Sequence, residues 1–82
     1  MELEYISGAV ESILFASGAP IEQKKLSEVL EIAPERLKEI VDTLRESYRR
    51  ENRGIDILTL DHSYQMCSSS YYGEITRKAL DH

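Results

Sequence analysis

The spacing of apolar residues in the first half of the chain predicts three helices. Over roughly residues 3 to 16, apolar residues recur every three or four positions and form the stripe Leu3, Ile6, Val10, Ile13 and Leu14. A second helix over roughly residues 22 to 31 has a narrower core face of Leu26, Val29 and Leu30. The third helix begins at Pro34, which suits a first helical turn, and its buried stripe is Leu37, Ile40, Val41, Leu44 and Tyr48.

After Gly54 the pattern changes to the two-residue alternation of β-strands. The first run alternates Ile55, Ile57 and Thr59 with Asp56, Leu58 and Leu60. After a turn at His62-Ser63, the second run alternates Tyr64, Met66 and Ser68 with Gln65 and Cys67. The two runs predict a β-hairpin. Ser69 or Ser70 can then cap a last helix that carries Tyr72, Ile75 and Leu80.

This order of elements predicts an α+β, mostly helical fold of the winged-helix type. The second and third helices are joined by a tight turn and form a helix-turn-helix pair, and the hairpin is the wing. The chain has 82 residues, which suits one domain with a thin core. We therefore expect residues 1–82 to form a single winged-helix domain.

The first helix carries more apolar surface than one buried stripe requires. Beside the stripe lie Tyr5, Ala9 and Ala16, so the apolar arc covers nearly half of the circumference. A strip of small residues repeats every four positions at Gly8, Ser12 and Ala16, and Phe15 lies next to it. Either the whole arc packs inside one domain, or this strip and Phe15 contact a second protein.

The charge pattern argues against a domain that reads DNA. The formal net charge is −5, which repels duplex DNA unless a basic patch overrides it. The polar face of the third helix mixes acidic and basic residues, which favours a solvated helix whose charges pair with each other. Its basic cluster at the helix end is explained by the helix dipole and consists of Arg45, Arg49, Arg50 and Arg53.

The residues that catalysis or metal binding would need are scarce. Cys67 is the one cysteine, and the histidines are His62 and His82, which gives neither a disulfide nor a metal-ligand spacing. A lone cysteine suits a reducing compartment such as the cytoplasm, and no apolar run is long enough to span a bilayer. Two or three of the tyrosines are expected at the edge of the core, and any that stay exposed favour a protein interface, where tyrosine is enriched. The candidate contacts therefore also include Tyr5, Tyr64, Tyr71 and Tyr72.

The stretch ESILFASGAP (residues 11–20) is similar to the signature E-x-I-L-F-x-x-G-x-P. This signature belongs to the segregation and condensation protein B family, and the chain resembles the N-terminal part of that family's proteins. The likeness continues through Leu26, Leu30, Leu44, Tyr48, Arg53-Gly54-Ile55 and the wing residues Tyr64-Gln65-Met66. The sequence departs from the family at the wing turn His62-Ser63, at Cys67-Ser68, and at Glu22, where a Ser or Thr cap is common.

The resemblance implies a non-enzymatic adaptor of the prokaryotic SMC complex. Family members are longer, with a second winged-helix domain, so the chain is expected to be an N-terminal fragment. They form homodimers that bind a kleisin subunit, segregation and condensation protein A, and through it SMC. The implied role is chromosome condensation and segregation in the cytoplasm at the nucleoid.

We expect no cofactor, small molecule, membrane or sequence-specific nucleic acid as a partner. The alternative left open is a transcription regulator that uses the winged helix to bind DNA.

Overall fold

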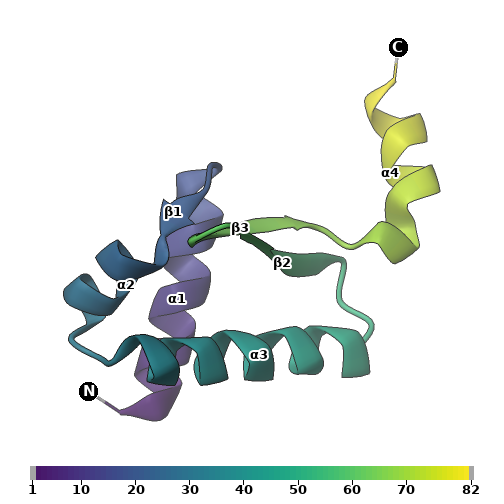
Figure 1. The fold of residues 1–82 in the computed structure, drawn as a ribbon. Helices are drawn as coiled ribbons and strands as arrows, with labels where there is room; N and C mark the ends of the chain where they lie inside the picture. The colour runs from purple at the N-terminus through teal and green to yellow at the C-terminus, as the bar shows by residue number, and fades with distance from the viewer. Residues whose placement is uncertain (1, 82) are drawn as a thin grey trace.

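The computed structural model describes residues 2–81 and has a winged-helix arrangement, as predicted (Figure 1). Its elements in chain order are α1 (Leu3–Ser17), β1 (Ile21–Glu22), α2 (Gln23–Leu30), α3 (Pro34–Arg50), β2 (Ile55–Leu60), β3 (Ser63–Ser68), the 3-10 turn η1 (Ser70–Tyr72) and α4 (Gly73–Leu80). The helices α1, α2 and α3 surround the core, and the hairpin β2–β3 closes one side of it. The predicted bounds of α1, α2 and the hairpin, and the predicted start of α3, differ from these by no more than one residue.

The break after α1 depends on Gly18. This residue takes a left-handed backbone with φ 63°, which glycine adopts without steric cost. The Ser17 hydroxyl donates to the Ala19 carbonyl at 2.7 Å and holds the turn. The chain then enters β1, a strand of two residues that the sequence pattern did not predict. It pairs antiparallel with β3, and Ile21 lies opposite Tyr64.

The core is built from one stripe of each main helix and two strand residues. Its fully or nearly buried members are Ile6, Val10, Leu14, Leu26, Leu30, Leu37, Ile40, Val41, Tyr48, Ile57 and Tyr64. Two predicted core positions are wrong, because Leu3 is 50% exposed and Val29 is 58% exposed. In α2, Leu26 and Leu30 stand one turn apart and face the core, so Val29 is turned away. The predicted stripe of α3 is confirmed, with Leu44 half-buried.

A partly buried hydrogen bond joins the two longest helices, α1 and α3. The Tyr48 hydroxyl of α3 donates to Oε2 of Glu11 on α1 at 2.6 Å. Burial raises the pKa of Tyr48, and the Glu11 carboxylate raises it further. The phenol therefore stays protonated and keeps donating throughout the ordinary pH range.

The three-stranded sheet has the order β1-β3-β2, which places β3 in the middle. Tyr64 lies on β3 opposite Ile21 on one side and Thr59 on the other. Its side chain points inward and is only 5% exposed. The prediction that Tyr64 belongs to a protein interface is therefore wrong, because the central strand directs it into the core.

The C-terminal helix leaves the body of the domain (Figure 1). The Ser69 hydroxyl accepts a hydrogen bond from the Tyr71 amide at 3.3 Å, so Ser69 caps η1, and α4 begins only at Gly73. Tyr72 therefore lies in η1 rather than in the last helix. Ile75 and Leu80 are 64% and 71% exposed, so the apolar residues of α4 contribute little to this core.

Candidate protein interface

The outer side of α1 presents a continuous exposed surface, which we call the α1 face. It consists of the predicted contact residues Tyr5, Gly8, Ser12, Phe15 and Ala16, all of which are exposed. Phe15 is 77% exposed and Tyr5 is 65% exposed. Because the core takes Ile6, Val10 and Leu14 from the opposite side of the helix, packing within the domain leaves the α1 face uncovered.

A shallow hollow of about 580 Å³ runs along the α1 face on the side of α2. It is lined by Glu4, Tyr5, Gly8, Ala9, Ser12, Ile13, Val29 and Leu30. A Cβ atom added at Gly8 would meet nothing within 4 Å, so packing within the domain does not require a glycine there. Val29 is a lining residue that the sequence pattern missed, since its helical spacing had assigned it to the core.

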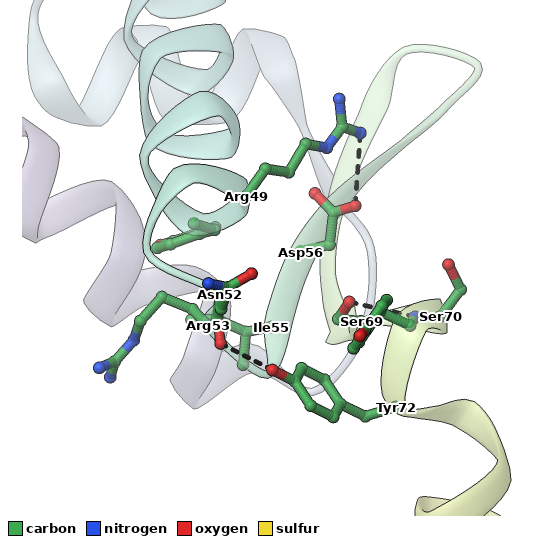
Figure 2. A pocket seen from close by; sticks show the side chains of 10 residues that line it. Arg49, Asn52, Arg53, Ile55, Asp56, Ser69, Ser70 and Tyr72 are labelled. Carbon is green, nitrogen blue, oxygen red and sulfur yellow. Dashed lines mark hydrogen bonds and ion pairs between the residues drawn. The ribbon is translucent and has the colours of Figure 1, made fainter.

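The predicted contact residues Tyr71 and Tyr72 lie on another part of the molecule, around η1. Their rings meet edge to face with centroids 5.0 Å apart. Figure 2 shows the Tyr72 hydroxyl donating to the Asn52 carbonyl, at 3.0 Å. Tyr72 is therefore half-buried and ties η1 to the end of α3, whereas Tyr71 is 85% exposed. Both line a hollow of about 400 Å³ that is separate from the one beside α1.

Two of the arginines that were predicted to interact with the helix dipole instead form ion pairs with the Asp56 carboxylate on β2. Nε of Arg45 lies 3.4 Å from Oδ1 of Asp56, and a terminal nitrogen of Arg49 lies 3.5 Å from Oδ2 (Figure 2 draws the second pair). The Ile57 amide also donates to Asp56, at 2.8 Å. Partial burial works to raise the pKa of Asp56, but this amide and the two guanidinium groups together outweigh it and lower the pKa.

We expect Asp56→Asn to lower the free energy of unfolding by about 1 kcal/mol at pH 7. The folded-state pKa of Asp56 is depressed, so its contribution is present above the unfolded pKa of about 4 and is lost as the pH falls through the folded value. Urea titrations between pH 7 and pH 2 should therefore show that the difference in free energy of unfolding between the unaltered chain and Asp56→Asn becomes smaller as the pH falls. Glu46→Gln, which neutralises an exposed carboxylate of α3, is the control. A difference independent of pH would contradict the pairing.

Most of the cations on α3, whose exposed face reads DNA in many winged helices, pair with carboxylates. Arg36 pairs with Glu39 and Lys38 with Asp42, each at 2.9 Å. Arg45 faces Asp56 in the same way. Paired charges of this kind are typical of a solvated helix surface. Phosphate contacts require basic groups that are free of carboxylate partners.

Cys67 is half-buried in β3, where its Sγ lies 3.7 Å from the Asp56 carbonyl. Burial raises the pKa of the Cys67 thiol, which is opposite to the lowered pKa of reactive cysteines. Within residues 2–81, the structure brings together no group of three His, Cys, Asp or Glu side chains that could hold a metal ion.

None of the helices in the described part of the chain combines the length and apolar character that crossing a membrane requires.

Sequence comparison assigns most of the chain to one family. The family model for the segregation and condensation complex subunit ScpB matches residues 8–82. Segregation and condensation protein B of Caldanaerobacter subterraneus subsp. tengcongensis is 41% identical over 73 residues, which cover 89% of this chain and 44% of that protein. The protein of the same name from Clostridioides difficile is 36% identical, over 99% of this chain and 46% of that protein. The chain thus spans less than half the length of these curated relatives.

Solved structures agree with this assignment. A crystal structure of a dimer of the ScpB N-terminal domain complexed with ScpA peptide superposes with a TM-score of 0.84 at 25% identity, and covers 95% of this chain and 98% of that one. ScpB from Mycobacterium tuberculosis has the same fold, with a TM-score of 0.87 at 15% identity over 98% of this chain and 50% of that chain. These structures share the fold of the chain, and the family-model match over residues 8–82 shows that the chain belongs to the ScpB family of segregation and condensation complex subunits.

Proposed function

We propose that this chain is a dimerising adaptor of the SMC complex, which acts by binding proteins rather than by catalysis. The observation that carries the proposal is the exposed α1 face on a domain that matches a dimeric ScpB N-terminal domain along almost its whole length. Large contiguous apolar patches are rare on the surface of a soluble monomer, whereas aromatic residues are enriched at interfaces. Phe15 and Tyr5 are such residues, and the α1 face is the proposed dimer contact.

The second proposed partner is the kleisin subunit ScpA. The support is that the matching ScpB domain was crystallised as a dimer with an ScpA peptide. A dimer presents two copies of each remaining surface, so one ScpA segment can contact both subunits and gain affinity from the combined area. The exposed Tyr71 beside α4 lies outside the proposed dimer contact and stays a candidate for this role.

We further propose that the chain is the N-terminal winged-helix domain of a longer protein with a second domain. The relatives are more than twice as long as the part that this chain matches, which supports the proposal. Its place of action would be the cytoplasm, at the nucleoid. The single cysteine is compatible with that reducing compartment.

Sedimentation and peptide binding test the proposal together. We expect sedimentation equilibrium to show a dimer at micromolar concentration, and fluorescence anisotropy to show saturable binding of a labelled peptide from the central segment of ScpA of the same organism. A labelled DNA duplex of similar length is the control, for which we expect no salt-dependent binding at micromolar protein. A chain that stays monomeric throughout this concentration range and does not bind the peptide would contradict the adaptor function. Salt-dependent binding of the DNA duplex would favour a transcription regulator.

A further inference from the structure

We infer that a hollow beside α2 binds a lysine side chain on an extended segment of a partner protein. This hollow, which we call the α2 hollow, has a volume of about 750 Å³. Among the described residues it shares no lining residue with the α1 face, with the hollow along α1 or with the hollow around η1. The inference therefore goes beyond the proposed function and adds a separate binding surface.

Three segments form the walls of the α2 hollow. They are the outer side of α2, the turn between α2 and α3 with Ile32 and Pro34, and the turn between β2 and β3 with His62. The Gln23 amide donates to the His62 carbonyl at 2.8 Å, which holds the hairpin turn against the start of α2. Backbone hydrogen bonds thus shape the α2 hollow, and a ligand would enter a site that is already formed.

The side-chain group that points to a ligand is the hydroxyl of Ser27, which lines the α2 hollow. Ser27 is only 7% exposed, and within residues 2–81 its Oγ is the one buried side-chain oxygen or nitrogen without a hydrogen-bond partner. Its backbone carbonyl, in contrast, accepts from the Ile32 amide at 3.1 Å. Buried polar groups in native proteins nearly always have a partner. A donor that enters the α2 hollow can supply the missing hydrogen bond to Ser27.

The charge of the α2 hollow shows which kind of donor fits. Its lining holds three carboxylates and one cation, namely Glu22, Glu28, Glu31 and Lys24. None of these three carboxylates forms an ion pair with another residue of the described range. Glu31 is four positions from Ser27 and three from Glu28, so the three side chains are neighbours on one side of the helix. An unpaired acidic surface of this kind attracts a cation and repels an acidic segment.

The backbone of Glu31 is strained. It ends α2 with φ 56° and ψ 45°, the left-handed region in which glycine is the usual residue at a helix C-terminus. Backbone strain of this kind is concentrated at functional sites. A glycine would relieve the strain but would remove the carboxylate from the α2 hollow, so a binding role for that carboxylate accounts for a glutamate at this position.

The apolar part of the α2 hollow favours lysine over arginine. Ile32 is half-buried and lines the hollow together with Pro34, and the hydrocarbon stem of a lysine can lie on such a surface. The lysine ammonium group has three donors, which can reach the Ser27 hydroxyl and the carboxylates of Glu28 and Glu31. An arginine instead presents a planar fork that suits one carboxylate in bidentate geometry.

Titration with short peptides, followed by nuclear magnetic resonance of the isotope-labelled chain, tests the inference. With acetyl-Gly-Lys-Gly-amide we expect the largest amide shift changes within residues 22–33 and at His62. The same peptide with norleucine in place of lysine keeps the stem and loses the charge. It should bind at least about tenfold more weakly, because it cannot form the charged hydrogen bonds.

Ser27→Ala is the decisive variant, because it leaves the net charge unchanged. It should raise the dissociation constant of the lysine peptide about tenfold, the effect of losing one hydrogen bond to a charged group. It should also raise the urea midpoint of the free chain, since it removes a buried hydroxyl that has no partner. Glu31→Gly should have the same two effects, by removing a carboxylate and relieving the strain.

Glu46→Gln is the matched control, because it removes one exposed carboxylate from α3, outside the α2 hollow. It should change the dissociation constant by less than about twofold. The inference is overturned if Ser27→Ala binds the lysine peptide as well as the unaltered chain does, if the norleucine peptide binds equally well, or if the shift changes lie outside the α2 hollow. Each of these results leaves the dimer and the binding of ScpA untouched, because sedimentation and the ScpA peptide test those separately.

Discussion

Phe15→Asp is expected to leave the domain folded and to convert the dimer into a monomer. Phe15 is 77% exposed within its own chain, so an aspartate there costs the single domain little. In the proposed dimer the same carboxylate would be buried against a partner without a counter-charge, which costs several kcal/mol, on the order of 3–5. Sedimentation equilibrium measures the loss of association, and far-ultraviolet circular dichroism measures folding.

Thr43→Asp is a matched control for this experiment. Thr43 is exposed on α3, away from the α1 face, and the substitution adds the same charge. It should leave the dissociation constant unchanged within about twofold, the effect of an ordinary surface substitution. A folded Phe15→Asp dimer as stable as the Thr43→Asp dimer would move the contact to another surface, and the exposed Tyr71 would be the next candidate.

Tyr64→Ala should lower the free energy of unfolding by about 3–5 kcal/mol, the usual cost of truncating a buried aromatic residue. Tyr64 is 5% exposed and packs in the central strand of the sheet. A domain of this size has a total stability near the low end of about 5–15 kcal/mol, so this one change should leave little of the folded state. Urea titration followed by circular dichroism at one fixed protein concentration measures the loss.

Two further variants show whether packing causes the loss at Tyr64. Tyr64→Phe keeps the ring and should cost less than about 1 kcal/mol. Tyr71→Ala removes a tyrosine that is 85% exposed and should cost less than about 0.5 kcal/mol. Equal losses of unfolding free energy for Tyr64→Ala and Tyr71→Ala would contradict the burial of Tyr64, and Tyr64 would again be a candidate interface residue.

The sequence pattern predicted the buried residues best where the apolar repeat continues over several helical turns. The α3 stripe repeats over several turns, so its phase is well determined, and Leu37, Ile40, Val41 and Tyr48 are buried as expected. The two-residue strand β1 is too short to have a period, and its pairing with β3 depends on residues about forty positions away. Asp56 meets Arg45 and Arg49 only because the chain reverses after α3, which helical spacing does not encode.

Single side chains of the candidate site were harder to place than the elements that carry them. The exposed positions of the α1 face were predictable because that helix has more apolar residues than one core stripe uses. Tyr64 was misplaced because two-residue alternation defines two faces of a strand without saying which is covered. Val29 was misplaced because α2 is short, so two leucines suffice to anchor it and the third apolar residue is free to line the hollow.

The projecting position of α4 has a consequence for how the molecule unfolds. The helix has eight residues, none of them buried, and it packs mainly on η1. Helices this short are marginal in water without tertiary support. Amide protons of α4 should therefore exchange with solvent through local opening events of small free energy, whereas those of α1 and α3 exchange only when the whole core opens. The domain is therefore expected to open in two steps, with α4 opening before the core, and a second surface that covered Ile75 and Leu80 would raise the free energy of opening α4.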